Sequence, residues 1–306
     1  MTGEGIPSKI EAGLKRNKME RKGIFMAVYC DLHTHSTFSD GTNTPAELIA
    51  LAEEKGLGAI ALTDHNTVAG LPEFMAAGKG KNVRAIAGTE FSTDYNGTEL
   101  HILGLFLQPE HYEPITALME DYCLRKEQSN RCLVDKLNAA GYAIDYDRIK
   151  DSTPEGQVNR ALIAAELTRL GYTESIQAAF KQLLSPKCGY YIPPERFSPF
   201  ETIRFIKSLG AVAVLAHPFL NLGEQILREF LKEAVPCGLD GMETLYSTYD
   251  EETTVTAKKV AEDFGILQSG GSDYHGGNKP HIQLGVGQGG LAVPYGLMTA
   301  LEERRK

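Results

Sequence analysis

The stretch AVYCDLHTHSTFSDG, residues 27–41, joins an apolar run to a group of polar side chains. His33 and His35 stand one residue apart where the run ends, so on an extended segment both imidazoles point to the same side and can reach one ion. Asp40 follows within a Ser-Asp-Gly turn. The stretch therefore predicts a buried strand that delivers three candidate metal ligands.

The same pattern, a short apolar run followed by polar residues, recurs along the chain. Ala59 to Leu62, Val83 to Ala87, Ala211 to Ala216 and Ile266 to Ser269 have the length of strands, and helical patterns separate most of them. Parallel strands with crossover helices gather side chains at the carboxyl-terminal rim of a sheet or barrel. The pattern predicts an α/β protein with a barrel-like core.

The rhythm of strands and helices divides the chain. Between residues 108 and 196 strand signals become sparse and long helical patterns dominate, which indicates an inserted helical subdomain. Residues 26–107 and 197–306 are interpreted as one discontinuous catalytic domain. Residues 1–25 hold fewer consecutive apolar residues than the roughly 7–15 of a secretory signal, and we expect them to form a flexible extension.

Composition restricts the partners. The net charge of −9 provides no basic surface for a long nucleic acid or an anionic membrane, so any nucleic-acid substrate is expected to be short. No apolar run approaches the ~20 residues of a membrane span. The five cysteines are odd in number and form no C-x-x-C pair, which favours a reducing cytoplasmic location.

Metal-ligand side chains follow most of the apolar runs. The candidates are His33, His35, Asp40, His65, Glu90, His101, His217, Asp273 and His275. A structural role is the simpler interpretation of one histidine, but six of the eight histidines in this pattern favour metal binding. Nitrogen and oxygen ligands without cysteine suit Zn, Mn or Fe, with Mg less favoured, and nine ligands exceed one ion's requirement. We expect two or three divalent ions.

Taken together, these motifs resemble the PHP (polymerase and histidinol phosphatase) superfamily of metal-dependent phosphoesterases, and in particular its TrpH-like branch. The matching segments are His33-x-His35 with Ser39-Asp40-Gly41, Thr63-Asp64-His65, Glu90 with His101, Leu215-Ala216-His217-Pro218, and Gly271-Ser272-Asp273-x-His275. The resemblance implies a distorted (β/α)7 barrel of the PHP type.

The resemblance also implies how the ligands divide among the ions. It places one ion on His33, His35, Glu90 and Asp273, a second on Glu90, His101 and His217, and a third on Asp40, His65 and His275. Clustered divalent ions bind phosphoryl oxygens and activate water, so the expected chemistry is phosphoester hydrolysis. We expect a metal-bound hydroxide, held at His33, His35, Glu90 and Asp273, to attack phosphorus.

The branch acts on nucleoside 3′,5′-bisphosphates and short oligonucleotides, so a small phosphorylated nucleotide is the expected substrate. Arg160 is predicted to bind a phosphate that is not cleaved, because a planar guanidinium matches two oxygens, and Lys187 is a weaker candidate. This chain departs from the branch pattern at two positions: Asn66 stands where the branch has aspartate, and Leu162 stands where it has histidine. Two alternatives stay open: a histidinol-phosphate-type phosphatase, and a non-catalytic metal-binding regulatory module.

Overall fold

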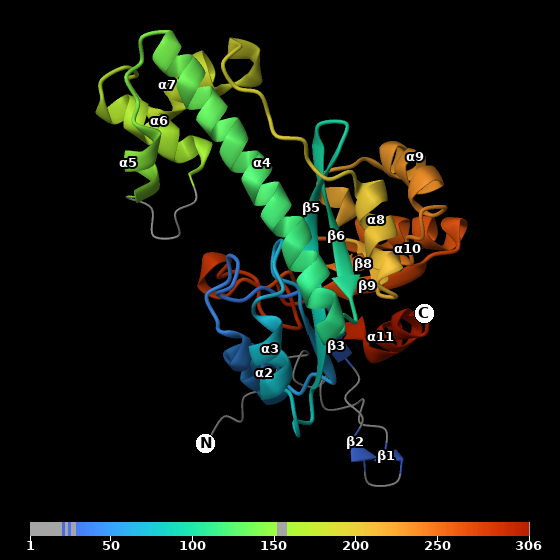
Figure 1. Ribbon diagram of the computed structural model, residues 1–306. Coiled ribbons are helices and arrows are strands. Elements are labelled where there is room, and N and C mark those ends of the chain that lie inside the picture. Colours follow the sequence, from blue (N-terminus) through green and yellow to red (C-terminus); the bar gives the residue numbers. More distant parts are fainter. Residues whose placement is uncertain (1–19, 22–23, 26–28, 152–157, 306) are drawn as a thin grey trace, which may run out of the picture. The chain divides into compact units, whose positions relative to one another are not determined.

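The computed structural model describes residues 20–21, 24–25, 29–151 and 158–305 (Figure 1). The chain forms two compact units, one running to Ile115 and resuming at Phe197, the other spanning Thr116 to Arg196. The predicted extension, residues 1–25, lies outside the described residues except for two short strands, β1 (Glu20–Arg21) and β2 (Ile24–Phe25), which pair antiparallel.

The first unit is built on an eight-stranded sheet. Its strands are β3 (Tyr29–Asp31), β4 (Ala59–Leu62), β5 (Arg84–Tyr95), β6 (Thr98–Leu105), β7 (Val212–Leu215), β8 (Gly241–Tyr246), β9 (Leu267–Gly271) and β10 (Val293–Pro294), in the order β10-β3-β4-β5-β6-β7-β8-β9. Neighbours run parallel except that β6 is antiparallel to β5 and β7, and β10 is antiparallel to β3. The Leu32 amide donates to the Gly270 carbonyl at 3.3 Å, so β3 lies beside β9 and the sheet nearly closes. The predicted α/β barrel is confirmed.

Helices cover this sheet. They are α2 (Pro45–Glu54), α3 (Leu71–Ala77), α8 (Pro199–Ser208), α9 (Glu224–Ala234), α10 (Glu251–Phe264) and α11 (Tyr295–Glu302). Helix α2 packs on β4, α3 on β5, and α8 on β5, β6 and β7. Figure 1 shows α8 beside β6. The sequence Thr44-Pro45-Ala46-Glu47 predicts a capping box at the start of α2, and the Thr44 side chain accepts from the Glu47 amide at 3.2 Å. The sequence Ser198-Pro199-Phe200-Glu201 predicts a second capping box, and this prediction is wrong because the Ser198 side chain accepts no capping hydrogen bond.

The core of the first unit follows the two-residue period of the strands. Ala59 and Ala61, like Leu103 and Leu105, face the same buried cluster, which Met298 and Leu301 of α11 complete. Ile86 of β5 belongs to this cluster, and Glu90 lies on the same face because four residues separate them. The inner face of the sheet is therefore apolar around Ile86 and becomes polar further along the strands, where Glu90 lies.

Glu90 and His101 differ from the expected position at strand ends, because both lie inside long strands. Strand β5 continues well past Leu62, where its neighbour β4 ends, and pairs with β6 as a hairpin whose tip is Tyr95 to Thr98. Residue 90 nevertheless stands just beyond the end of β4, where it forms an isolated bridge with His65. The end of the shorter strand β4 therefore determines where the polar rim of the barrel begins.

The second unit is helical. It contains most of α4 (Tyr112–Ala139), then α5 (Tyr146–Asp151), α6 (Arg160–Arg169), α7 (Ile176–Ala179), a π-helical turn η2 (Phe180–Leu184) and a 3-10 turn η3 (Pro186–Cys188). Its own apolar core includes Leu133, Leu137, Ile163, Leu167 and Leu184. Residues 176–184 are helical throughout, and α7 passes at Phe180 into the π-helical turn.

Two expectations from composition can be compared with the structure. No helix in the described ranges combines the length and apolar character that crossing a bilayer requires. All five cysteines are free, with Cys30 buried and Cys123 exposed.

Gly271, at the end of β9, is required by a close approach to His33. A Cβ added there would lie 2.3 Å from His33 Cβ and 2.6 Å from its backbone nitrogen. We predict that Gly271→Ala lowers the free energy of unfolding by about 1–3 kcal/mol, because the two backbones must separate. Gly290→Ala, where a Cβ meets nothing within 4 Å, is the control in denaturant unfolding. Equal stability of the two variants would contradict this account.

Candidate metal centre

The loop after β3 brings the first three candidate ligands together. His33 and His35 are fully buried, and the chain then turns so that the Gly41 amide donates to the Ser36 carbonyl at 2.9 Å. A Cβ at Gly41 would lie 2.3 Å from the His35 carbonyl oxygen, so the turn accepts only glycine. Asp40 just before it keeps a half-exposed carboxylate.

Asp64 holds this loop in place. Its buried carboxylate accepts hydrogen bonds from the Ser36 amide at 2.7 Å, the Ser36 hydroxyl at 2.6 Å and the Ser39 hydroxyl at 2.7 Å. Asn66, which stands where the branch pattern has an aspartate, has a left-handed backbone with φ 52°, which asparagine tolerates. Its amide group exchanges two hydrogen bonds with Ser92 of β5, so it ties the His65 turn to the strand that carries Glu90.

Glu90 is the centre of the site. Its side chain is fully buried, and each oxygen faces different imidazoles. Oε1 lies 2.8 Å from His101 Nδ1 and 3.1 Å from His217 Nε2, and Oε2 lies 3.2 Å from His33 Nε2, 3.3 Å from His35 Nε2 and 3.1 Å from His65 Nδ1. One carboxylate therefore contacts five histidines from four segments of the chain.

Asp273 and His275 approach from the loop after β9. Asp273 Oδ1 lies 3.2 Å from His35 Nε2 and 3.6 Å from His33 Nε2. His275 lies with Nδ1 2.8 Å from the Asp273 carbonyl oxygen, which leaves Nε2 3.2 Å from Asp40. Asp273 has φ 55° and His217 has φ 28°, so two of the candidate ligands have a left-handed backbone that side chains other than glycine rarely adopt. Such strain is concentrated at functional sites.

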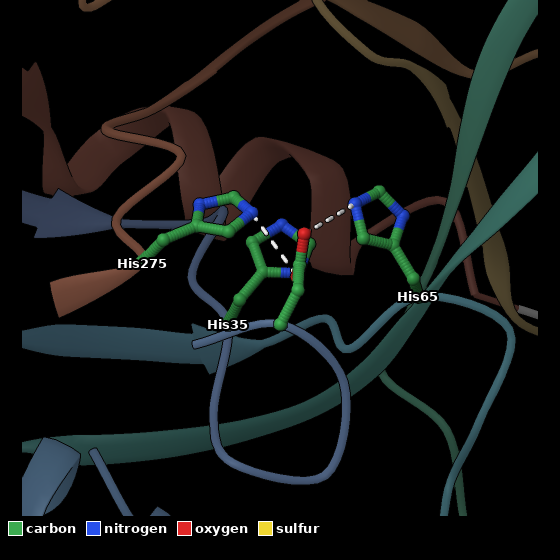
Figure 2. A group of neighbouring side chains, drawn as sticks. His35, His65 and His275 are labelled. Carbon is green, nitrogen blue, oxygen red and sulfur yellow. Dashed lines mark ion pairs between the residues drawn. The ribbon is translucent and has the colours of Figure 1, made fainter. Parts of the chain in front are cut away.

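All nine residues predicted as metal ligands are brought together. Their ligand atoms form four groups in which every atom lies within 4.8 Å of the others: His35, Asp40, His65 and His275; His33, Glu90 and His217; His33, His35 and Asp273; and His65, Glu90 and His101. Figure 2 shows the imidazoles of His35, His65 and His275 converging in the first group. The arrangement suits several ions that share ligands.

Unpartnered buried atoms test whether metal ions fit these groups. Within the described residues, the buried atoms that lack hydrogen-bond partners include His33 Nε2, both His35 ring nitrogens, His65 Nδ1, His275 Nε2 and Glu90 Oε2. Leaving one such atom unsatisfied costs about 1–3 kcal/mol, so six in one place need a ligand. Divalent ions such as Zn²⁺ bind imidazole nitrogens and carboxylate oxygens, and here these atoms face one another across 3–4 Å. The site is therefore consistent with a multinuclear metal centre.

The electrostatics of the centre favour cations. Burial opposes ionisation of Glu90, but the surrounding imidazoles hold its pKa well below the usual range. Burial lowers the pKa of His65 to about 4, which keeps its ring neutral and able to donate a lone pair. For His33, burial acts in the same direction, yet Glu90, Glu243 and Asp273 outweigh it and raise the pKa. The carboxylates thus remain charged and attract either protons or metal ions.

Glu243 of β8 is a site residue that the sequence did not assign. Its buried side chain accepts from His33 Nδ1 at 3.1 Å and from the His217 amide at 2.7 Å. It therefore orients the His33 ring so that Nε2 faces Glu90, and it holds the left-handed backbone of His217. A carboxylate behind a metal-binding histidine is a common support for such sites. A lone glutamate in an apolar strand gave no local signal.

Asp31 provides a second buried support. It accepts from the Ser272 amide and hydroxyl at 2.8 and 2.5 Å and from the Gly285 amide at 2.8 Å. Burial raises its pKa, and the hydrogen bonds offset part of that effect. Asp31 thus fixes the loop that carries Asp273 against the strand that leads to His33.

The predicted substrate contacts lie in the helical unit. The Arg160 guanidinium stands over the Tyr191 ring, 4.2 Å from its centroid, and donates to the Leu184 carbonyl at 3.4 Å. Lys187 is exposed in the turn η3. Their phosphate-binding roles stay predictions.

Comparison with known proteins gives one family and three informative relatives. The family model described as PHP domain matches residues 31–192. A 5′-3′ exoribonuclease of Haemophilus influenzae is 32% identical over 246 residues, which cover 80% of this chain and 89% of that protein. A phosphoribosyl 1,2-cyclic phosphate 1,2-diphosphodiesterase of Eggerthella lenta is 29% identical over 84% of this chain and 98% of its own. A 3′,5′-nucleoside bisphosphate phosphatase of Chromobacterium violaceum is 28% identical over 80% of this chain and 86% of its own.

The chain therefore belongs to the PHP domain family. Its class is that of a metal-dependent phosphoesterase, as its motifs indicated.

We predict that Glu243→Gln weakens metal binding by roughly 10- to 100-fold, the usual effect of losing a support behind a ligand. Glutamine offers one acceptor oxygen where the His33 ring and the His217 amide both donate, so one donor would face an amide nitrogen. Titration of the metal-free protein with Zn²⁺ or Mn²⁺ measures the effect. Glu229→Gln, on the exposed face of α9, is the control, and equal affinities would refute a positioning role.

Proposed function

We propose that this protein hydrolyses terminal phosphoesters of small nucleotides, namely nucleoside 3′,5′-bisphosphates or the 5′ ends of short oligoribonucleotides. The observation that carries the proposal is the convergence of nine imidazole and carboxylate side chains in four overlapping groups, with five of the histidines in contact with Glu90. The exoribonuclease and the bisphosphate phosphatase among the relatives support the substrate class. The net charge of −9 agrees with a substrate too short to need a basic surface.

We infer the accessible side of the centre from the exposure of its members. The side chains of His33, His35 and Glu90 are fully buried, whereas 25% of His65 and 55% of Asp40 is exposed. A phosphoryl group would therefore enter from the side of Asp40 and His65 and meet the ions of that edge first.

Divalent ions bound here would polarise phosphoryl oxygens and lower the pKa of a coordinated water towards ~7. The protein's own contribution is to hold the ligands in position. Glu90 fixes five rings, Glu243 orients His33, and Asp273 is fixed through its second oxygen by the Tyr246 hydroxyl at 2.7 Å.

Water is a better candidate nucleophile than any nearby side chain. The Ser36 and Ser272 hydroxyls donate to Asp64 and Asp31, and the Thr34 hydroxyl donates to the Ala61 carbonyl at 2.6 Å. Burial raises the pKa of Cys30 far above its usual value, so its thiol stays protonated. Ser36, Ser272 and Thr34 are fully buried and their hydroxyls are engaged in these structural hydrogen bonds, so none of them is available to attack a substrate.

Removing a ligand tests the role of the cluster. We expect His33→Ala and Asp273→Asn each to lose bound metal and to lower kcat/KM by about 100-fold or more, because a direct ligand matters at least as much as its support. Asparagine retains the left-handed backbone at position 273, so the fold is kept. His111→Ala, a histidine outside the four groups, is the control. Far-UV circular dichroism checks the fold, and full activity in a metal-depleted variant would exclude the mechanism.

A substrate panel separates the candidate functions. Metal-loaded protein is assayed with adenosine 3′,5′-bisphosphate, a 5′-phosphorylated RNA trinucleotide, histidinol phosphate and phosphoribosyl 1,2-cyclic phosphate. We expect turnover of the first two. Preference for the cyclic phosphate would favour the function of the Eggerthella lenta relative, and preference for histidinol phosphate the alternative phosphatase. Turnover of none with Zn²⁺, Mn²⁺ or Fe²⁺ would favour a regulatory module.

A further inference from the structure

Lys279 lies beside the metal centre but has no part in the functions derived above. Its ammonium group is 2.7 Å from Asp273 Oδ2, and 38% of its side chain is exposed. Among the ion pairs that the nine clustered residues form in the described chain, Lys279 is the one lysine or arginine partner. It is therefore a partly exposed positive charge at the edge of a site built from histidines and carboxylates.

The backbone of Lys279 is held, while its side chain is partly exposed. It follows the 3-10 turn η5 (Gly276–Asn278), in which the Gly277 amide donates to the Thr42 hydroxyl at 2.7 Å and the Asn278 side chain donates to the Asp40 carbonyl at 2.8 Å. These bonds join the Lys279 loop to the loop that carries Asp40. The lysine thus stands on the edge from which we infer that substrate enters.

Asp273 does not need Lys279 to satisfy its second oxygen. The buried Tyr246 hydroxyl already donates to Oδ2 at 2.7 Å, and the first oxygen faces His33 and His35. An ammonium group has three donors, and the Asp273 contact uses one of them. The others are free to reach a further acceptor.

We propose that Lys279 binds a phosphoryl oxygen of the substrate. The inference rests on the proposed function, because it requires a phosphate at the metal centre. A phosphate brings more negative charge than Asp273 does, so Lys279 can bind both acceptors or turn from one to the other. Its positive charge would help the ions to neutralise the negative charge of the phosphate. It would therefore favour phosphate over uncharged ligands.

The test compares Lys279→Met with Tyr246→Phe, since both remove a donor from the same oxygen of Asp273. The metal content of each loaded variant is measured first, and the dissociation constant for inorganic phosphate is then measured by calorimetry. For Lys279→Met we expect full metal content and roughly 10- to 100-fold weaker phosphate binding, the effect of one hydrogen bond to a charged group. Lys279→Arg should recover most of the affinity, and Tyr246→Phe at saturating metal should weaken phosphate binding clearly less than Lys279→Met does.

Unchanged phosphate affinity in Lys279→Met would overturn the inference, and so would loss of bound metal from that variant. Equal weakening of phosphate binding in Lys279→Met and Tyr246→Phe would also overturn it, because it would mean that the lysine acts through Asp273. Wild-type protein that turns over nucleotides but binds no inorganic phosphate would also overturn it while leaving the proposed function intact. Conversely, phosphate binding that depends on Lys279 without turnover of any substrate would support the inference and count against the proposed function.

Discussion

The buried carboxylate of Glu90 is the feature on which the site depends. A charge without water around it is costly, and five imidazoles supply the stabilisation that water would otherwise give. Because those imidazoles come from the loops after β3, β4 and β7 and from β6, the same contacts link four strands at the rim of the barrel. The contacts that form the metal centre therefore also help to close the sheet into a barrel.

Further buried carboxylates form a layer behind the candidate ligands. Asp64 fixes the loop that carries Asp40, Asp31 fixes the loop that carries Asp273, and Glu243 fixes His33 and His217. Each accepts from serine hydroxyls, backbone amides or a ring nitrogen. This layer leaves the ligand atoms little freedom to move, which explains how so many rings can converge in one place.

Much of this was accessible from the sequence, because spacing and local chemistry encode it. The His33 pair, the Ser-Asp-Gly turn and the capping box at Thr44 are local patterns, and the apolar runs at residues 59–62 and 211–216 contain the strands β4 and β7. The position of Glu90 inside a strand was not predictable, since it depends on β4 ending earlier than β5. Glu243 was missed because its contact with His33 spans 210 residues and leaves no mark on either segment.

The hairpin of β5 and β6 has a consequence for how this scaffold can change. Glu90 and His101 face the centre from opposite arms, and the turn between Tyr95 and Thr98 lies beyond both. Residues inserted at that turn would extend the hairpin without shifting the register below it, whereas one residue inserted between Glu90 and Tyr95 would turn one of the two side chains to the wrong face. The tip of the hairpin is thus the place where residues can be added while the ion-binding side chains keep their positions.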